Sequence, residues 1–413
     1  MKIIYVFERR HCYKYDYDMF QFDSFLKHSW EVECWSAVNW TFSNIDRPPN
    51  EDTSERSHYI NHLDDLIDNL ERIKGEKCFF LVYPYHAYGK ISYTIRKYIK
   101  KYGFEFANIT ESPAVDLPFH ERYTGIIRIL YLEFLKLLRI LVNIVRILFS
   151  KKEDRELLVR YISNRIYSFW GPFLCRSKFN YVTVSSVYAS FPNLFECKSK
   201  RNILIHSNSY DEFIVSQESK DEEKSTIVFI DCYHTGHSDY PKNGMNFPIS
   251  NKESYFENLN RLFKKLEDLY DCEVVIAAHP KSEYSGHEFG GRSLIYGKTN
   301  ILIKMAKLVI VDISTCFGVI VLFKKDFLNV YTPEMFVNAP RHFQPVYKTI
   351  HNIFGCRQLD ITDRNEIEDV KSYIYHYNRK GYEKYLKYYV KDSFDEMCHE
   401  KFYDTVYNTL KYN

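Results

Sequence analysis

The sequence is 413 residues long, with 45% apolar and 27% charged residues, and it carries 56 basic against 54 acidic side chains. This length exceeds what one hydrophobic core usually organises, so two domains are expected. The balanced charge gives no reason to expect nucleic acid as a partner. The ten cysteines include no CxxC pair, which argues against a structural zinc site and fits free thiols in a reducing compartment.

Apolar runs of strand length alternate with amphipathic helical patterns through the first half of the chain. Strands are expected at residues 2–7, 31–37, 78–84, 105–110 and 181–186, and helices at 18–30, 55–73 and 90–102. This alternation is typical of a parallel sheet with crossover helices.

A long helical pattern rich in Leu and Ile occupies residues 121–150 and opens a helical insertion near 121–170. Four basic residues fall in one stripe roughly 80° wide: Arg128, Lys136, Arg139 and Arg146. Such a helix can lie on a membrane surface, or it can be buried with its basic stripe facing water. The cations make a true membrane span unfavourable, and no signal peptide is apparent. A cytoplasmic protein is expected, with peripheral contact to the inner membrane face as an open alternative.

The second half repeats the strand–helix rhythm after a charged stretch, residues 207–225, that reads as a linker. Strands are expected at 225–231, 272–278, 307–312 and 327–332, helices at 252–269, 298–307 and 314–324, and a Tyr-rich helical tail after 365. The chain is therefore predicted to have an α/β fold of two Rossmann-like domains with a cleft between them and a helical C-terminal tail. The expected divisions are an N-terminal domain at 1–206, a C-terminal domain at 207–385, and a tail at 386–413 that could pack back on the N-terminal domain.

Polar side chains follow three strands of the second half, at the sheet edge where parallel α/β sheets bind ligands. His279, Pro280 and Lys281 end the second of these strands. Ser314 and Thr315 end the third and precede an apolar helix, an N-cap position that favours a phosphate. His279 and Lys281 could donate to the same phosphate. Plain helix capping and a structural histidine are the alternatives.

Three residues are candidates for a general base that takes a proton from a hydroxyl group. Asp239 and His237 lie in a polar loop after the first of those strands, and Glu111 follows a first-half strand. A loop at a domain edge and a capping carboxylate are the alternatives. The DxD at residues 16–18 is typical of metal-dependent transferases, but helix capping explains it better, so no essential metal and no other cofactor is expected.

The run AAHPK (277–281) and, about thirty residues later, DIST (312–315) resemble the His-Pro and Ser/Thr motifs of bacterial sialyltransferase-like enzymes. They also resemble motifs of the teichoic-acid glycerophosphotransferases and of capsule and lipopolysaccharide transferases that use CMP-activated acidic sugars. The resemblance covers roughly residues 226–332 and implies the two-domain GT-B arrangement. It implies that His279 holds the donor phosphate, and that Ser314 and Thr315 bind this phosphate or the nucleoside. The acidic motif that supplies the sialyltransferase base has no clean match here.

The resemblance favours a metal-independent glycosyltransferase that moves a sugar from a nucleotide donor onto a surface polysaccharide or lipid-linked glycan. A CMP-linked acidic sugar of the nonulosonic or Kdo type is the expected donor, and a monophosphate leaving group fits the absence of a metal requirement. Three alternatives stay open: a polyol-phosphate transferase with a CDP-linked donor, a non-catalytic scaffold of polysaccharide assembly, and a sugar-nucleotide epimerase of the same two-domain fold.

Overall fold

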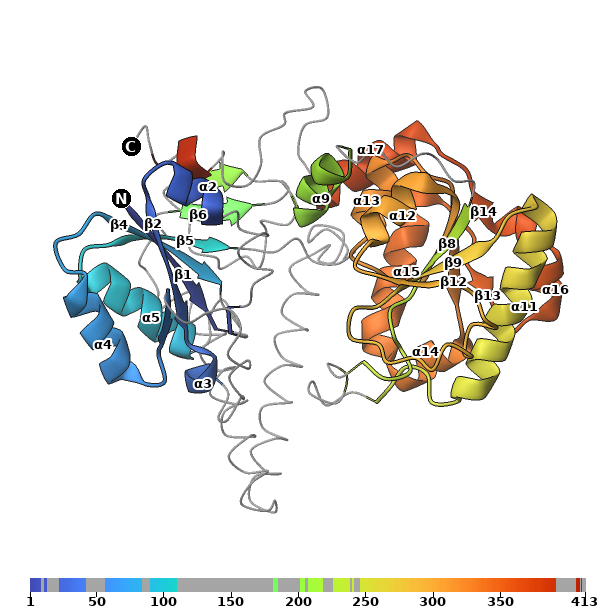
Figure 1. Cartoon of the computed structure of the whole chain (residues 1–413), viewed down its shortest axis with the longest axis horizontal. Helices are drawn as coiled ribbons and strands as arrows, with labels where there is room; N and C mark the ends of the chain where they lie inside the picture. Colours follow the sequence, from blue (N-terminus) through green and yellow to red (C-terminus); the bar gives the residue numbers. More distant parts are fainter. Residues whose placement is uncertain are drawn as a thin grey trace, which may run out of the picture.

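The computed structural model describes residues 1–8, 11–12, 22–41, 56–83, 90–109, 181–184, 201–204, 207–217, 226–237, 240, 246–390, 406–408 and 410. These residues form two α/β units, each built on its own sheet. Figure 1 shows the first sheet in blue to light green and the second unit in green to red. Within the described ranges, no helix has the length and apolar character needed to cross a membrane.

The first sheet is parallel, in the order β3-β2-β1-β4-β5-β6-β7. Its strands are β1 (Lys2–Phe7), β2 (Glu31–Ser36), β3 (Ser57–Tyr59), β4 (Cys78–Tyr83), β5 (Glu105–Ile109), β6 (Tyr181–Val184) and β7 (Arg201–Leu204). The helices described beside it are α2 (Phe22–Lys27), α3 (Val38–Thr41), α4 (Leu63–Arg72) and α5 (Lys90–Lys101). The helix predicted from residue 55 is wrong at its start, because Ser57–Tyr59 pairs with β2 and α4 begins only after its N-cap, His62.

The second sheet has the order β10-β9-β8-β11-β12-β13, with β14 antiparallel against β12. Its strands are β8 (Thr226–Ile230), β9 (Val274–Ala278), β10 (Leu294–Tyr296), β11 (Ala306–Val311), β12 (Phe327–Tyr331), β13 (Leu359–Asp360) and β14 (Ile374–Tyr375). Its helices are α9 (Asn208–Gln217), α11 (Lys252–Tyr270), α12 (Thr299–Met305), α13 (Phe317–Leu322), α14 (Pro333–Asn338), α15 (Pro340–Phe354), α16 (Arg364–Glu368) and α17 (Arg379–Tyr389), with a 3-10 turn at Val370–Tyr373.

The strand order of the second sheet reverses direction between β8 and β11. From β8 the chain moves outward to β9 and β10, and it then returns to the other side of β8 to form β11 and β12. In open α/β sheets, ligands bind outside the carboxyl ends of the strands at such a reversal. A ligand site is therefore expected at the carboxyl ends of β8 and β11.

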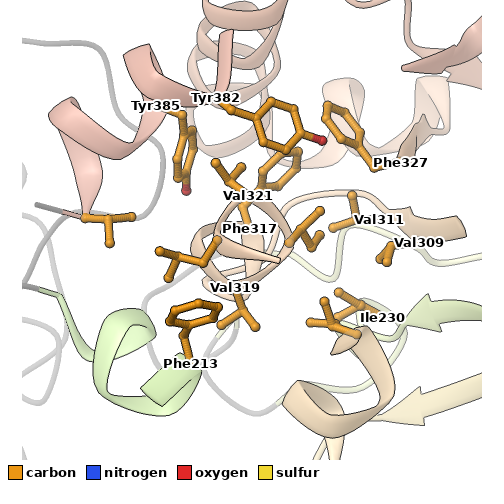
Figure 2. Packing of buried hydrophobic residues seen from close by; sticks show 14 of the residues in the cluster. Phe213, Ile230, Val309, Val311, Phe317, Val319, Val321, Phe327, Tyr382 and Tyr385 are labelled. Carbon is orange, nitrogen blue, oxygen red and sulfur yellow. The ribbon is translucent and has the colours of Figure 1, made fainter. Parts of the chain in front are cut away.

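The linker predicted at residues 207–225 is wrong over Asn208–Gln217, which forms α9. Tyr210, Phe213 and Ile214 are buried in the same apolar cluster as Phe317. Their spacing of three and four residues places them on one helical face, and the charged residues after 217 concealed this pattern. Figure 2 shows Phe213 beside Val319 of the buried segment 317–322, and its ring centroid lies 4.8 Å from that of Phe323. This helix is therefore part of the second unit's core.

Helix α13 is completely buried and lies between α9 and α17 (Figure 2). A Cβ atom added at Gly318 would lie 2.7 Å from both Cβ and Oγ of Ser209. Such an approach is too close for real atoms, so one of the two helices would have to shift. Glycine at this position allows α9 to pack directly on α13.

We expect Gly318→Ala to lower the free energy of unfolding by about 1–3 kcal/mol, because overpacking exceeds the gain in helix propensity. Chemical denaturation followed by circular dichroism measures the change. The matched control is Ser209→Gly, which removes the opposing side chain. The double variant should recover part of the loss, so simple addition of the two single effects would contradict this contact.

The last described residues return to the first unit. Val406 and Leu410 are buried in the cluster that contains Ile3, Tyr5 and Phe7 of β1. In Figure 1 the red segment of the last described residues lies beside α2 of this unit, where Tyr407 contacts Trp30. The core of the first sheet thus includes side chains from both ends of the described chain.

Candidate functional site

Asp231, the residue directly after β8, organises the carboxyl end of this strand. Its side chain is buried, and Oδ1 accepts the backbone N–H of Tyr233 at 2.9 Å. Its Oδ2 accepts the backbone N–H of His279 at 3.2 Å and the hydroxyl of Tyr284 at 2.9 Å. One carboxylate therefore joins the loop after β8 to the loop after β9. Burial raises the pKa of Asp231, and the three donors partly offset this shift.

Tyr233 has a left-handed backbone, with φ of 53°. This conformation is uncommon for a residue with a bulky side chain, and surrounding contacts must hold it. The ring lies over Gly236, where an added Cβ would approach it to 2.5 Å, and stacks on His279 with centroids 6.3 Å apart and planes at 21°. The glycine and the unusual backbone together place the tyrosine ring against His279.

His279 and His237 come together at this edge of the sheet, with ring centroids 4.6 Å apart. The Nδ1 atom of His279 accepts the backbone N–H of Lys281 at 3.1 Å. The neutral ring of His279 therefore carries its proton on Nε2, which is its hydrogen-bond donor. Pro280 and Lys281 follow as exposed residues.

Ser314 and Thr315 follow β11 but do not cap α13 as predicted. The helix begins at Phe317 with Cys316 as its N-cap, and it is only six residues long. Ser314 Oγ accepts the N–H of Cys316 at 3.1 Å, and its carbonyl accepts the N–H of Phe317 at 3.2 Å. These bonds form a turn that delays the helix by two residues. The Thr315 carbonyl accepts the hydroxyl of Ser209 at 3.3 Å.

A cluster of largely buried polar side chains lies at the sheet reversal between β8 and β11. His234 Nε2 lies 2.7 Å from Asp312 Oδ2, and its Nδ1 lies 2.7 Å from the hydroxyl of Tyr240. Cys232 Sγ donates to the carbonyl of Ile313 at 2.8 Å. Burial, followed by the nearby Asp312 carboxylate, raises the pKa of Cys232. Cys232, His234 and Asp312 offer ligand atoms that all lie within 4.8 Å of one another, a set that could hold a metal ion.

The sequence pattern did not predict the structural role of the cluster formed by Cys232, His234 and Asp312, or that of Asp231. The available signal was the position of polar residues directly after buried strands, which applies to both Asp231 and Asp312. Tyr233 and Tyr284 carried no signal, since an aromatic residue in a loop is common.

Several predicted residues lie outside the described part of the chain. These are the candidate bases Asp239 and Glu111, the DxD at residues 16–18, and the amphipathic segment 121–150. Their roles remain predictions.

Neither known family profiles nor curated proteins match the sequence. Among solved structures, the chain is similar to UDP-GlcNAc 2-epimerase from Methanocaldococcus jannaschii, with a TM-score of 0.50 at 10% identity over 100% of both chains. It is also similar to MurG from Acinetobacter baumannii, with a TM-score of 0.48 at 10% identity over 100% of this chain and 99% of that one.

The two parallel sheets and the likeness to the epimerase define the fold. The chain has the α/β architecture of two Rossmann-like domains of the GT-B type, as the sequence predicted. At this identity the likeness concerns the fold alone, and function depends on the site.

Proposed function

We propose that the protein is a glycosyltransferase that binds an activated nucleotide sugar at the carboxyl edge of the second sheet. The observation that carries this proposal is the meeting of His279 and His237, whose ring centroids lie 4.6 Å apart beside the sheet reversal. The His279 ring has a defined N–H donor, and the His237 ring is close enough to act on the same substrate.

In this proposal His279 Nε2–H donates to the donor phosphate, and the exposed Lys281 ammonium adds a positive charge. Pro280 fixes the backbone between them. The hydroxyls of Ser314 and Thr315 bind the same phosphate or the nucleoside. The turn that they form, and not a helix N-terminus, would present these hydroxyls.

The reaction moves one proton and one sugar. The acceptor hydroxyl loses its proton to a base as its oxygen bonds to the anomeric carbon, and the phosphate leaves with the electrons of the broken C–O bond. His237 is the described candidate for this base, and Asp239 and Glu111 are the further candidates. No metal is assigned to the donor phosphate in this scheme.

The finer assignment is a CMP-linked acidic sugar transferred to a surface polysaccharide or lipid-linked glycan. It is supported by the His-Pro and Ser/Thr motifs and by the positive charge that Lys281 offers to a donor carboxylate or phosphate. Residues 1–206 would hold the acceptor, residues 207–385 the donor, and the tail from 386 would pack on the N-terminal domain. The protein would act in the cytoplasm, with segment 121–150 docking on the inner membrane face.

The test is isothermal calorimetry of the purified chain with CMP, CDP, UDP and GDP. We expect selective CMP binding that His279→Ala weakens by about 10- to 100-fold, the effect of losing a hydrogen bond to a charged group. The matched control is His287→Ala, an exposed histidine in the loop between β9 and β10, which should leave the affinity unchanged.

Selective binding of CDP would indicate the polyol-phosphate transferase instead. Preference for UDP or GDP would reject the CMP assignment while keeping nucleotide-sugar chemistry. An epimerase would interconvert its nucleotide sugar without an acceptor. If no nucleotide bound, a non-catalytic scaffold would replace the proposed function.

A further inference from the structure

The side chains of Cys232, His234 and Asp312 are arranged like residues that bind a metal ion directly. A thiol, an imidazole nitrogen and a carboxylate oxygen lie within 4.8 Å of one another at the reversal between β8 and β11. Only 3% of His234 and 1% of Asp312 are exposed, so these polar groups are withdrawn from water. Burying such groups is unfavourable unless each has a partner.

The contact with Asp312 leaves one ring nitrogen of His234 without a hydrogen bond. The Nε2–Oδ2 separation is 2.7 Å, yet the pair does not meet hydrogen-bond geometry, and Nε2 is a buried atom without a hydrogen-bond partner in the described structure. The other ring nitrogen is held by Tyr240 at 2.7 Å. A metal-bound histidine shows this arrangement, with one nitrogen fixed by an outer partner and the other directed at the ion.

We propose that Cys232, His234 and Asp312 bind one Zn²⁺ ion, which ties the carboxyl ends of β8 and β11 together. Thiolate, imidazole and carboxylate together match the ligand preference of zinc. The thiolate and the carboxylate balance the two positive charges, so the buried site is neutral. The Cys232 thiol gives up its proton to solvent on binding.

The ligand atoms must shift to reach tetrahedral zinc geometry. Ligands of a tetrahedral zinc ion lie roughly 3.3–3.8 Å apart, so the 2.7 Å between Nε2 and Oδ2 must widen by about 0.6 Å. Outer partners already hold the ligands, since Asp312 Oδ1 accepts the N–H of Ile313 and Asn329 donates to the carbonyl of Asp312 at 2.7 Å. Cys232 is partly exposed and offers a route of entry. A fourth position remains for water.

The test is the zinc content of the full chain, purified without chelator and with any histidine tag removed, by plasma mass spectrometry. We expect about one zinc per chain, and a ~10-fold or greater loss in Cys232→Ser. Cys316→Ser is the matched control, because this partly exposed thiol lies on the neighbouring turn outside the ligand group. It should retain the metal.

Cobalt substitution gives a second readout that does not depend on a variant folding. Co²⁺ added to the metal-free wild-type chain should produce the near-ultraviolet charge-transfer band of a cobalt–thiolate bond. Metal-free protein that takes up neither Zn²⁺ nor Co²⁺, or equal metal loss in both cysteine variants, would overturn the site. Neither measurement involves a nucleotide, so the zinc site is tested independently of the proposed transferase activity.

Discussion

Phe317→Ala is expected to lower the free energy of unfolding by about 3–5 kcal/mol, the usual effect of removing a buried aromatic ring. Phe317 is fully buried in α13. Its ring centroid lies 5.1 Å from that of Phe327 and 5.8 Å from those of Phe354 and Tyr385. These partners come from three different elements, so the resulting cavity cannot close by a single movement.

Urea denaturation followed by far-ultraviolet circular dichroism measures this loss. The matched control is Val337→Ala, at a position that is 77% exposed, and it should change stability by no more than about 0.5 kcal/mol. Circular dichroism is used because all four tryptophans lie before residue 171, so tryptophan fluorescence reports on the first half of the chain and not on α13. A loss as small as that of the control would show that α13 is not central to this core.

Asp231→Ala is expected to destabilise the protein by about 2–3 kcal/mol, because it removes the acceptor for three donors at once. These donors are the N–H groups of Tyr233 and His279 and the hydroxyl of Tyr284. The same substitution releases the loop after β9 from the loop after β8. Thermal and urea unfolding measure the loss, and a variant as stable as the wild type would show that water replaces the carboxylate.

Asp231→Asn has a similar size without the charge, and it isolates the effect of ionisation. Because burial raises the folded-state pKa of Asp231 above its ordinary value of 3.8, the folded protein binds this proton more tightly than the unfolded chain. The stability contributed by that proton is present below pH 3.8 and is lost as the pH rises through the folded pKa. The wild type should therefore lose stability relative to Asp231→Asn as the pH rises above 3.8. A pH-independent difference would contradict the shift.

The regular part of the fold follows from sequence periodicity. Buried strand β9, and β1 after Lys2, are uninterrupted apolar runs, and α11 has a clear apolar face with Asn251 as its cap. Short or partly exposed elements are harder to predict, as at β10 and β13, because pairing with neighbours stabilises them and local sequence does not. Helix α9 was missed because its apolar face is short and adjoins charged residues.

The position of the candidate site follows from the sequence pattern, but the arrangement of its side chains does not. The sheet edge follows from the strand pattern, so His279 and Ser314 could be selected from sequence. The left-handed backbone of Tyr233 and the contact between His234 and Asp312 depend on residues brought together from separate loops. No local pattern encodes such contacts, and the predicted cap at Ser314 failed because one side-chain hydrogen bond moved the start of α13.

The packing of Val406 and Leu410 against β1 affects how the protein is made. Their side chains complete the apolar cluster of a sheet whose first strand ends at Phe7. At ordinary rates of translation, about 20–80 s separate the synthesis of these two parts of the chain. During that interval the nascent first domain exposes the apolar surface that the last residues will cover.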